Sequence, residues 1–162
     1  MRTLPAATDL PLRAMPHNGL RGRWNDCAAV LTRLVPDDLL ALASRVSIAA
    51  IFFLSGRTKV EGLLTLTDSA YELFRTEYKL PLLPPELAAH LAAYAEHLFP
   101  LLLFFGLFTR FSALALLGMT LVIQLFVYPA AWPTHLSWAA LLLYLVGRGG
   151  GRLALDRLLR IA

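Results

Sequence analysis

Residues 111–128 read FSALALLGMTLVIQLFVY, a run without a single charged residue. Its length is close to the ~20 apolar residues that an α-helix needs to cross a bilayer. Two similar stretches precede it, residues 39–56, which only Arg45 interrupts, and residues 87–108. A fourth, residues 133–151, reaches spanning length only when a charged residue near its end is included. The sequence therefore predicts an all-α integral membrane protein, a four-helix bundle.

The composition supports a membrane location and excludes several classes of protein. Hydrophobic residues make up 57% of the 162 residues and charged residues only 16%, with a mean hydropathy of +0.60. Soluble domains average about 25% charged residues. The only cysteine, Cys27, excludes an internal disulfide framework and an all-cysteine metal site. The sequence also lacks a Walker motif, a dinucleotide-binding glycine fingerprint and a hydrolase nucleophile elbow, so conventional soluble enzyme chemistry is not expected.

Polar segments flank and connect the predicted spans. Residues 1–37 form an N-terminal tail, which we expect to be disordered up to residue 23 and helical from Trp24 onward. Residues 38–148 form the transmembrane domain, and residues 149–162 form a C-terminal amphipathic tail. Within residues 57–85, one interfacial amphipathic helix is predicted, because these apolar residues share one helical face: Leu63, Leu66, Ala70, Phe74 and Tyr78.

Basic residues are distributed unequally between the two predicted sides of the membrane. Four spans place both termini and the turn at Thr109 and Arg110 on one side, which collects ten basic residues against four on the other. The positive-inside rule then predicts that both termini are cytoplasmic.

Two opposite charges fall within the predicted spans, Arg45 in the first and Glu96 in the second. A charge at the bilayer centre costs at least ~2.5 kcal/mol on insertion scales, so each of them requires a partner. We expect a buried ion pair between Arg45 and Glu96. Its role is either structural, fixing the register of the helices, or functional, as a gate or a proton-linked site.

Further polar residues lie at membrane depth on the second, third and fourth spans. Spacings of three and four residues place His90, Tyr94 and His97 on one face of a helix. The predicted topology brings His90 to the depth of Gln124 and His135. Each of these groups either satisfies a neighbouring polar group, or the cluster holds a quinone head group or a transition metal. The candidate cofactor-binding residues are His90, Tyr94, His97, Gln124 and His135.

Two short motifs occur in order along the chain. One is Phe-x-x-Ser-Gly-x-x-Lys, which ends at Lys59, and the other is Gly-Leu-Phe-Thr-Arg at residues 106–110. Together with Arg45, Glu96 and the sequence HLSWA at residues 135–139, they resemble the DoxX family of small four-helix bacterial membrane proteins. The resemblance covers residues 45–156, and its motif residues are Ser55, Gly56, Lys59, Pro100, Gly106, Thr109 and Arg110.

The resemblance implies a multi-pass protein of the bacterial inner membrane and transfers no catalytic residues. Some relatives are subunits of a thiosulfate:quinone oxidoreductase, others belong to assemblies that resist oxidative stress, and others are encoded beside small metal-binding peptides. We expect a non-catalytic subunit of a membrane complex in redox or metal-stress handling. The alternatives are a quinone-linked oxidoreductase subunit and a component of metal or small-peptide transport.

The residue pattern and the resemblance together leave the cofactor open. Quinone, haem and copper are the candidate cofactors. The expected partners are the lipid bilayer, other membrane or redox subunits and a second copy of the chain, with no nucleic acid.

Overall fold

The computed structural model describes residues 19–78 and 80–161, and the chain divides into two compact units, Met1–Pro36 and Asp37–Ala162. The described part of the first unit is one helix, α1 (Leu20–Leu34). Residues 1–18 of the predicted disordered tail lie outside the described residues. The prediction is wrong for residues 20–23, because Leu20 continues the helical spacing of Trp24 and Leu31 and the helix begins one turn earlier.

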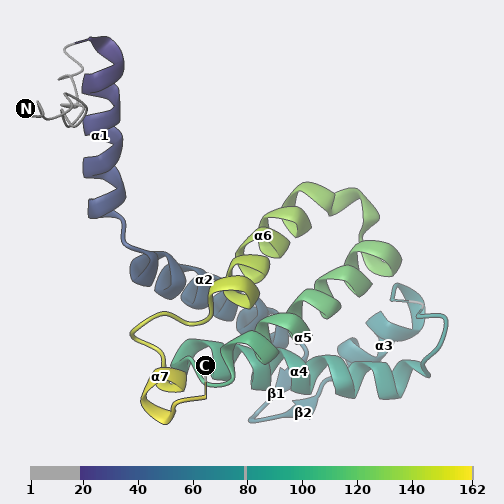
Figure 1. The fold of residues 1–162 in the computed structure, drawn as a ribbon. Coiled ribbons are helices and arrows are strands. Elements are labelled where there is room, and N and C mark those ends of the chain that lie inside the picture. The colour runs from purple at the N-terminus through teal and green to yellow at the C-terminus, as the bar shows by residue number, and fades with distance from the viewer. Residues whose placement is uncertain (1–18, 79, 162) are drawn as a thin grey trace, which may run out of the picture. The chain divides into compact units, whose positions relative to one another are not determined.

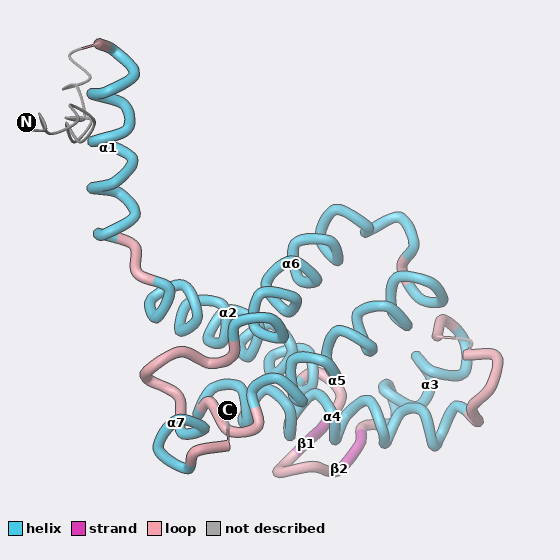
Figure 2. Tube along the Cα trace, viewed as in Figure 1, coloured by secondary structure: helices cyan, strands magenta, loops and turns pink. Residues whose placement is uncertain are grey.

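Four long helices make up most of the second unit (Figures 1 and 2). They are α2 (Asp37–Arg57), α4 (Pro85–Phe105), α5 (Thr109–Val122) and α6 (Trp132–Arg148). A π-helical turn, Ile123–Val127, extends α5, and a short 3₁₀ turn, Pro129–Ala131, leads into α6. The helices begin where acidic residues or proline suit a first turn, as at Asp37 and Pro85.

Three helices in the described part of the chain are long and apolar enough to cross a membrane: α2, α4 and the continuous stretch Thr109–Val127. The limits of these three agree with the predicted spans to within a few residues. The helix α6 has 17 residues and is therefore about 25 Å long, against a hydrocarbon core of ~30 Å. The four-helix transmembrane bundle accordingly stays a prediction.

The core of the second unit lies between these four helices. The helix α2 packs against α4 and α6, and α5 packs against the same two helices. Large side chains from each helix are fully buried at the centre, with Phe52 of α2, Leu103 of α4, Leu116 of α5 and Leu142 of α6 among them. This packing leaves the connection between α2 and α4 to cover one end of the unit (Figure 1).

That connection is not a single amphipathic helix, and the prediction for residues 57–85 is wrong in this respect. Two short antiparallel strands, β1 (Val60–Glu61) and β2 (Thr65–Leu66), precede the short helix α3 (Asp68–Thr76). Gly62 turns the hairpin with a φ of +59°, and the hydroxyl of Thr67 caps α3 by accepting from the backbone N–H of Ala70 at 3.2 Å.

The amphipathic pattern does hold within α3 itself. Ala70 and Phe74 are buried, as predicted, and α3 packs against α4. Leu63, which was expected on the same face, lies at the hairpin tip and is 89% exposed.

The C-terminal segment packs onto the turn between α4 and α5. The short helix α7 (Leu155–Leu159) carries Asp156, whose carboxylate accepts from the backbone N–H groups of Phe108 at 2.6 Å and Thr109 at 2.8 Å. A carboxylate at this position satisfies N–H groups that the first turn of α5 leaves free. Residues 149–162 therefore belong to the same compact unit as the spans.

Candidate ligand cavity

The Ser-Gly-x-x-Lys motif brings a lysine onto a carboxylate in the interior of the second unit. Lys59, just beyond the end of α2, places its Nζ atom 2.7 Å from Glu96 Oε2 on α4. The hydroxyl of Ser55 donates to Glu96 Oε1 at 3.3 Å, and the ammonium also contacts the Ser55 carbonyl oxygen at 3.2 Å and Oγ at 3.1 Å. Lys59 and Glu96 are only 6% and 4% exposed. The three residues form one buried polar cluster, the Lys59–Glu96–Ser55 cluster.

Gly56 allows the helices to approach closely enough for this cluster to form. A Cβ atom at this position would lie 2.9 Å from His97 Cε1 and 3.0 Å from Glu96 Cβ. Real Cβ atoms are not found so close to other heavy atoms, so any side chain would push α2 away from α4. The glycine of the motif thus fixes which residues of α2 and α4 face each other.

The predicted ion pair between Arg45 and Glu96 is wrong. Arg45 is buried, but its guanidinium donates to the backbone carbonyls of Leu103 at 2.8 Å, Phe104 at 2.7 Å and Gly150 at 3.0 Å. Leu103 lies seven residues beyond Glu96, about 10 Å further along α4. The contact of Gly56 with Glu96 sets this register. Arg45 therefore binds carbonyls at the C-terminal end of α4, where the helix dipole favours a cation.

The second family motif has a structural role at the same end of α4. Gly106 takes a φ of +68° and ends the helix, with its N–H bonded to the carbonyl of Leu103 and the N–H of Leu107 bonded to that of Leu102. Arg110 donates to the carbonyls at residues 146 and 147 at the end of α6. Thr109 is buried beside Gly150. A Cβ added at Gly150 would lie 2.7 Å from the hydroxyl oxygen of Thr109.

The Lys59–Glu96–Ser55 cluster forms part of the wall of a cavity of about 410 Å³. Apolar side chains make up most of the remaining wall, and the cavity lies between all four long helices and the connection that contains α3. Pro100 is buried in α4, one turn beyond Glu96. Because proline has no backbone N–H, it cannot donate a hydrogen bond to the carbonyl of Glu96. The lining includes Phe52, Phe74, Tyr78, Ala92, Phe99, Ala115, Met119, Tyr128, His135 and Trp138.

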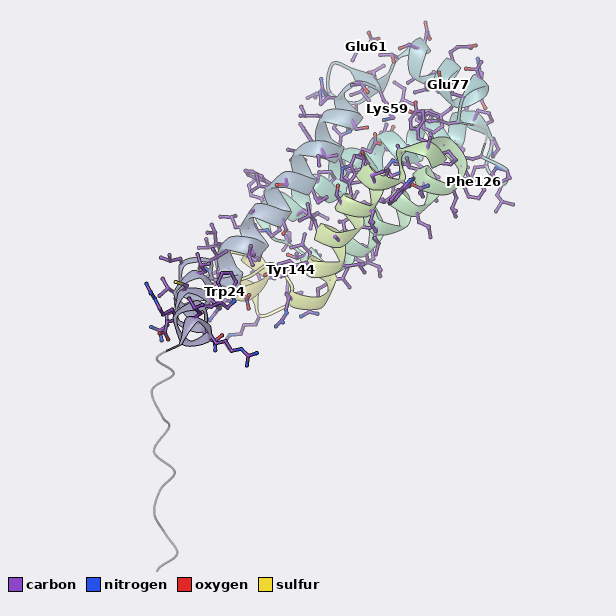
Figure 3. All side chains as sticks on the ribbon, turned by 90° about the horizontal axis from the view of Figure 1, so that it is seen from above. Trp24, Lys59, Glu61, Glu77, Phe126 and Tyr144 are labelled. Atoms are coloured by element: carbon purple, nitrogen blue, oxygen red, sulfur yellow. The ribbon has the colours of Figure 1, made fainter. Side chains whose placement is uncertain are left out.

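Two tyrosines bridge the cavity rim between the α3 connection and the end of the π-helical turn. Tyr78 and Tyr128 place their hydroxyls 3.2 Å apart, and Tyr128 donates to Glu77 Oε2 at 3.2 Å. Tyr78 must therefore donate to Tyr128. Burial and this hydrogen bond raise the pKa of Tyr78 well above its ordinary value, so the phenol stays protonated. Figure 3 shows Lys59 and Glu77 near the same end of the unit, with Tyr144 near the opposite end.

His135 reaches the cavity from the first turn of α6. Its Nδ1 atom lies 2.7 Å from Gln124 Oε1, and the side-chain amide of Gln124 donates to the carbonyl of Pro129 at 2.9 Å. The amide orientation makes Nδ1 the donor, so the imidazole keeps Nε2 as a hydrogen-bond acceptor. The ring also packs beside Trp138 with 5.2 Å between centroids. The π-helical turn is what places Gln124 against His135, and such turns recur at functional sites.

The remaining predicted cofactor ligands do not join this site. His90 donates from Nδ1 to the carbonyl of Glu86 at 2.8 Å, and its Nε2 lies 3.2 Å from the hydroxyl of Tyr71 on α3. Both ring nitrogens of His90 are thus occupied, and the predicted convergence of His90 with Gln124 and His135 is wrong. The half-exposed ring of Tyr94 packs beside His90.

His97 is buried and is not part of the cavity lining. Its Nδ1 donates to the carbonyl of Ala93 at 2.7 Å, and its ring meets that of Phe53. Among the described residues, no group of three or more His, Cys, Asp or Glu side chains could hold a metal ion.

Sequence analysis identifies Lys59 only as a motif residue, and it misses both the pairing of Lys59 with Glu96 and the role of Asp156. The charge count assigns Lys59 to the outer side of the membrane, and only the close contact of Gly56 with α4 brings it to Glu96. Asp156 has no signal in its neighbouring sequence, because its role depends on the turn between α4 and α5, about fifty residues away.

Comparison with known proteins covers the same motif residues. The family profile described as DoxX matches residues 40–129, which include Ser55, Gly56, Lys59, Glu96 and the Gly-Leu-Phe-Thr-Arg motif. A protein of Haemophilus influenzae described as uncharacterized is 31% identical over 132 residues, covering 74% of this chain and 82% of its own length. No solved structure matches the chain. The chain belongs to the DoxX family of membrane proteins.

Proposed function

We propose that this chain is a membrane-embedded, non-catalytic subunit of a redox assembly and that its cavity binds a lipophilic ring compound of the quinone class. The observation that carries the proposal is the Lys59–Glu96–Ser55 cluster in the wall of a mostly apolar cavity. A buried ion pair is weak evidence for stability, and ionisable groups at membrane depth mark ligand or proton pathways more often than not. Apolar pockets with a few polar groups are typical of small-molecule sites.

The size and entrance of the cavity suit a ligand that arrives from the bilayer. A volume of about 410 Å³ falls within the range of small-molecule sites, ~300–1,000 Å³. Leu91 and Tyr128 line the cavity and are 51% and 46% exposed; Leu91 lies on the membrane-capable helix α4, and Tyr128 directly follows the membrane-capable stretch Thr109–Val127. An apolar compound dissolved in the lipid could therefore enter beside these residues without passing through water.

The hydrogen-bonding capacity of the cavity favours the reduced form of such a ligand. The donor groups of Lys59, Ser55 and Tyr78 are already engaged within the protein. The carboxylate of Glu96 and Nε2 of His135 keep acceptor capacity. A dihydroxy ring can donate a hydrogen bond to each acceptor, whereas the quinone form offers only carbonyl acceptors. We therefore expect the quinol to bind more tightly than the quinone.

The proposed cellular setting follows from charge and from the family. Ten basic residues on the side of the termini against four on the other favour cytoplasmic termini in the bacterial inner membrane. The four long helices then form the transmembrane bundle, with α3 at the outer interface. A role in redox or metal-stress handling is what the family resemblance implies. A bound quinone would connect the chain to the redox reactions of the assembly.

Trp138 offers a direct test, because it lines the cavity whereas Trp132 and Trp24 are not part of its lining. In the variant Trp24→Phe/Trp132→Phe, a short-chain quinone should quench the fluorescence of Trp138 along a saturable curve, and the matching quinol should displace it. The control Trp138→Phe keeps the other two tryptophans and should show only the linear quenching of quinone dissolved in detergent.

Two substitutions on α5 separate binding in the cavity from binding elsewhere. Ala115→Phe adds a ring within the cavity and should abolish the saturable phase. Gly118→Ala, three residues away, does not line this cavity, its added Cβ meets no heavy atom within 4 Å, and the saturable phase should persist. Linear quenching of Trp138 in the parent variant, with no effect of Ala115→Phe, would refute the proposed ligand.

A further inference from the structure

The helix α1 carries a continuous apolar face that no other described element explains. At 100° per residue, most of its apolar side chains fall on one side, whereas Ala29 and Val30 lie among the polar side chains on the other. Trp24 is 72% exposed and Leu31 is 60% exposed, although both lie at the centre of the apolar face. That face consists of Leu20, Trp24, Cys27, Ala28, Leu31 and Leu34.

The charges of α1 are arranged around this face. Arg21 and Arg23 border it on opposite sides, and Arg33 lies on the polar side. Asp26 is the one acidic residue of the helix, which leaves a net charge of +2. Arginines at the edges of an apolar face can bury their hydrocarbon stems while the guanidinium groups remain at the level of lipid phosphates.

The helix α1 lies directly before a membrane-capable helix in the chain. Only Val35 and Pro36 separate it from α2, which is long and apolar enough to span a bilayer. An apolar face tethered so closely to a span meets the lipid interface at high local concentration.

We propose that α1 binds the surface of an anionic lipid bilayer, with Trp24 and Leu31 below the head groups and Arg21 and Arg23 against lipid phosphates. A protein groove is the less suitable occupant, because cations on both edges of the face match a continuous negative surface. The inference stands independently of any ligand in the cavity.

Lipid-dependent fluorescence quenching tests this assignment in the full-length protein. The variant Trp132→Phe/Trp138→Phe keeps Trp24 as the only tryptophan. In vesicles, brominated phosphatidylglycerol should quench Trp24 more strongly than brominated phosphatidylcholine at the same bromine density. Replacing Arg21, Arg23 and Arg33 with glutamine should remove this preference, and high salt should reduce it. The matched control Asp26→Asn should keep it.

A second probe covers the case in which the two tryptophan replacements impair folding. A nitroxide on Cys27, the only cysteine of the chain, should collide with oxygen more often than with a water-soluble nickel chelate, as expected for the apolar face in lipid. A nitroxide at Asn25 on the polar face should show the reverse preference. If the nitroxides at Cys27 and Asn25 are equally accessible to the nickel chelate, the proposal is overturned. A Trp24 that is shielded from water yet unquenched by either brominated lipid would also overturn it.

Discussion

The Lys59–Glu96 ion pair should respond to mutation as a buried pair whose members depend on each other. Glu96→Leu leaves an ammonium that is 6% exposed with only the two oxygen contacts to Ser55. Lys59→Met leaves a carboxylate that is 4% exposed with one serine donor. Breaking a buried pair by removing one partner costs about 3–5 kcal/mol. Each single variant should therefore lose that much free energy of unfolding.

The double variant Lys59→Met/Glu96→Leu should recover most of the loss, because apolar replacement of both charges is often neutral or stabilising. The coupling free energy is obtained from a double-mutant cycle, with unfolding measured by titrating a denaturing detergent into mixed micelles. The exposed pair Arg75–Glu86 has a similar separation, 2.8 Å, and is a matched control that should show little coupling. Single variants as stable as the unchanged protein would refute the burial argument, and additive losses would refute the pairing.

The other predictions concern packing and topology. Arg45→Met should lower stability by about 3 kcal/mol or more, since it removes the guanidinium donor from three carbonyls, of which that of Leu103 keeps a second donor in the N–H of Gly106. The loss of unfolding free energy from Arg45→Met should add to that from Glu96→Leu in the same detergent titration. Strong coupling between the two substitutions would instead indicate that Arg45 and Glu96 do form an ion pair. Gly56→Val should lower the melting temperature in detergent because its Cβ would lie 2.9 Å from His97, whereas Gly118→Ala, which meets open space, should not. In a Cys27→Ser background, a membrane-impermeant maleimide added to intact cells should label a cysteine at Asp68 and spare one at Asn25, and the opposite pattern would invert the proposed topology.

The spans themselves could be predicted from sequence because their signals are local. Long, mostly apolar stretches define α2, α4 and α5, and Asp37, Pro85 and Gly106 mark helix ends through effects within one turn. The hairpin before α3 has no comparable signal. Its strands contain only two residues each, and the spacing of Leu66 and Phe74 fits a helix equally well.

The site could not be predicted to the same degree, because it depends on the register between helices. Depth in the membrane placed Arg45 and Glu96 near the bilayer centre, but it does not specify how far one helix slides along the other. The close contact of Gly56 with Glu96 sets the register of α2 against α4. In this register the partner of Glu96 is Lys59 rather than Arg45. Of the polar cluster, Gln124 and His135 meet as expected, whereas His90 is taken up by Tyr71 of the α3 connection, whose fold was itself not predicted.

The most direct test of the central claim is the chemical identity of what the cavity holds. The protein would be purified from native membranes in mild detergent and extracted with organic solvent, and quinone and quinol would be measured by mass spectrometry per mole of protein. The account predicts near-stoichiometric quinone-class compound with the unchanged protein and with Gly118→Ala, and its loss from Ala115→Phe at equal protein recovery. A quinone content equal to that of the surrounding lipid in all three proteins would contradict it.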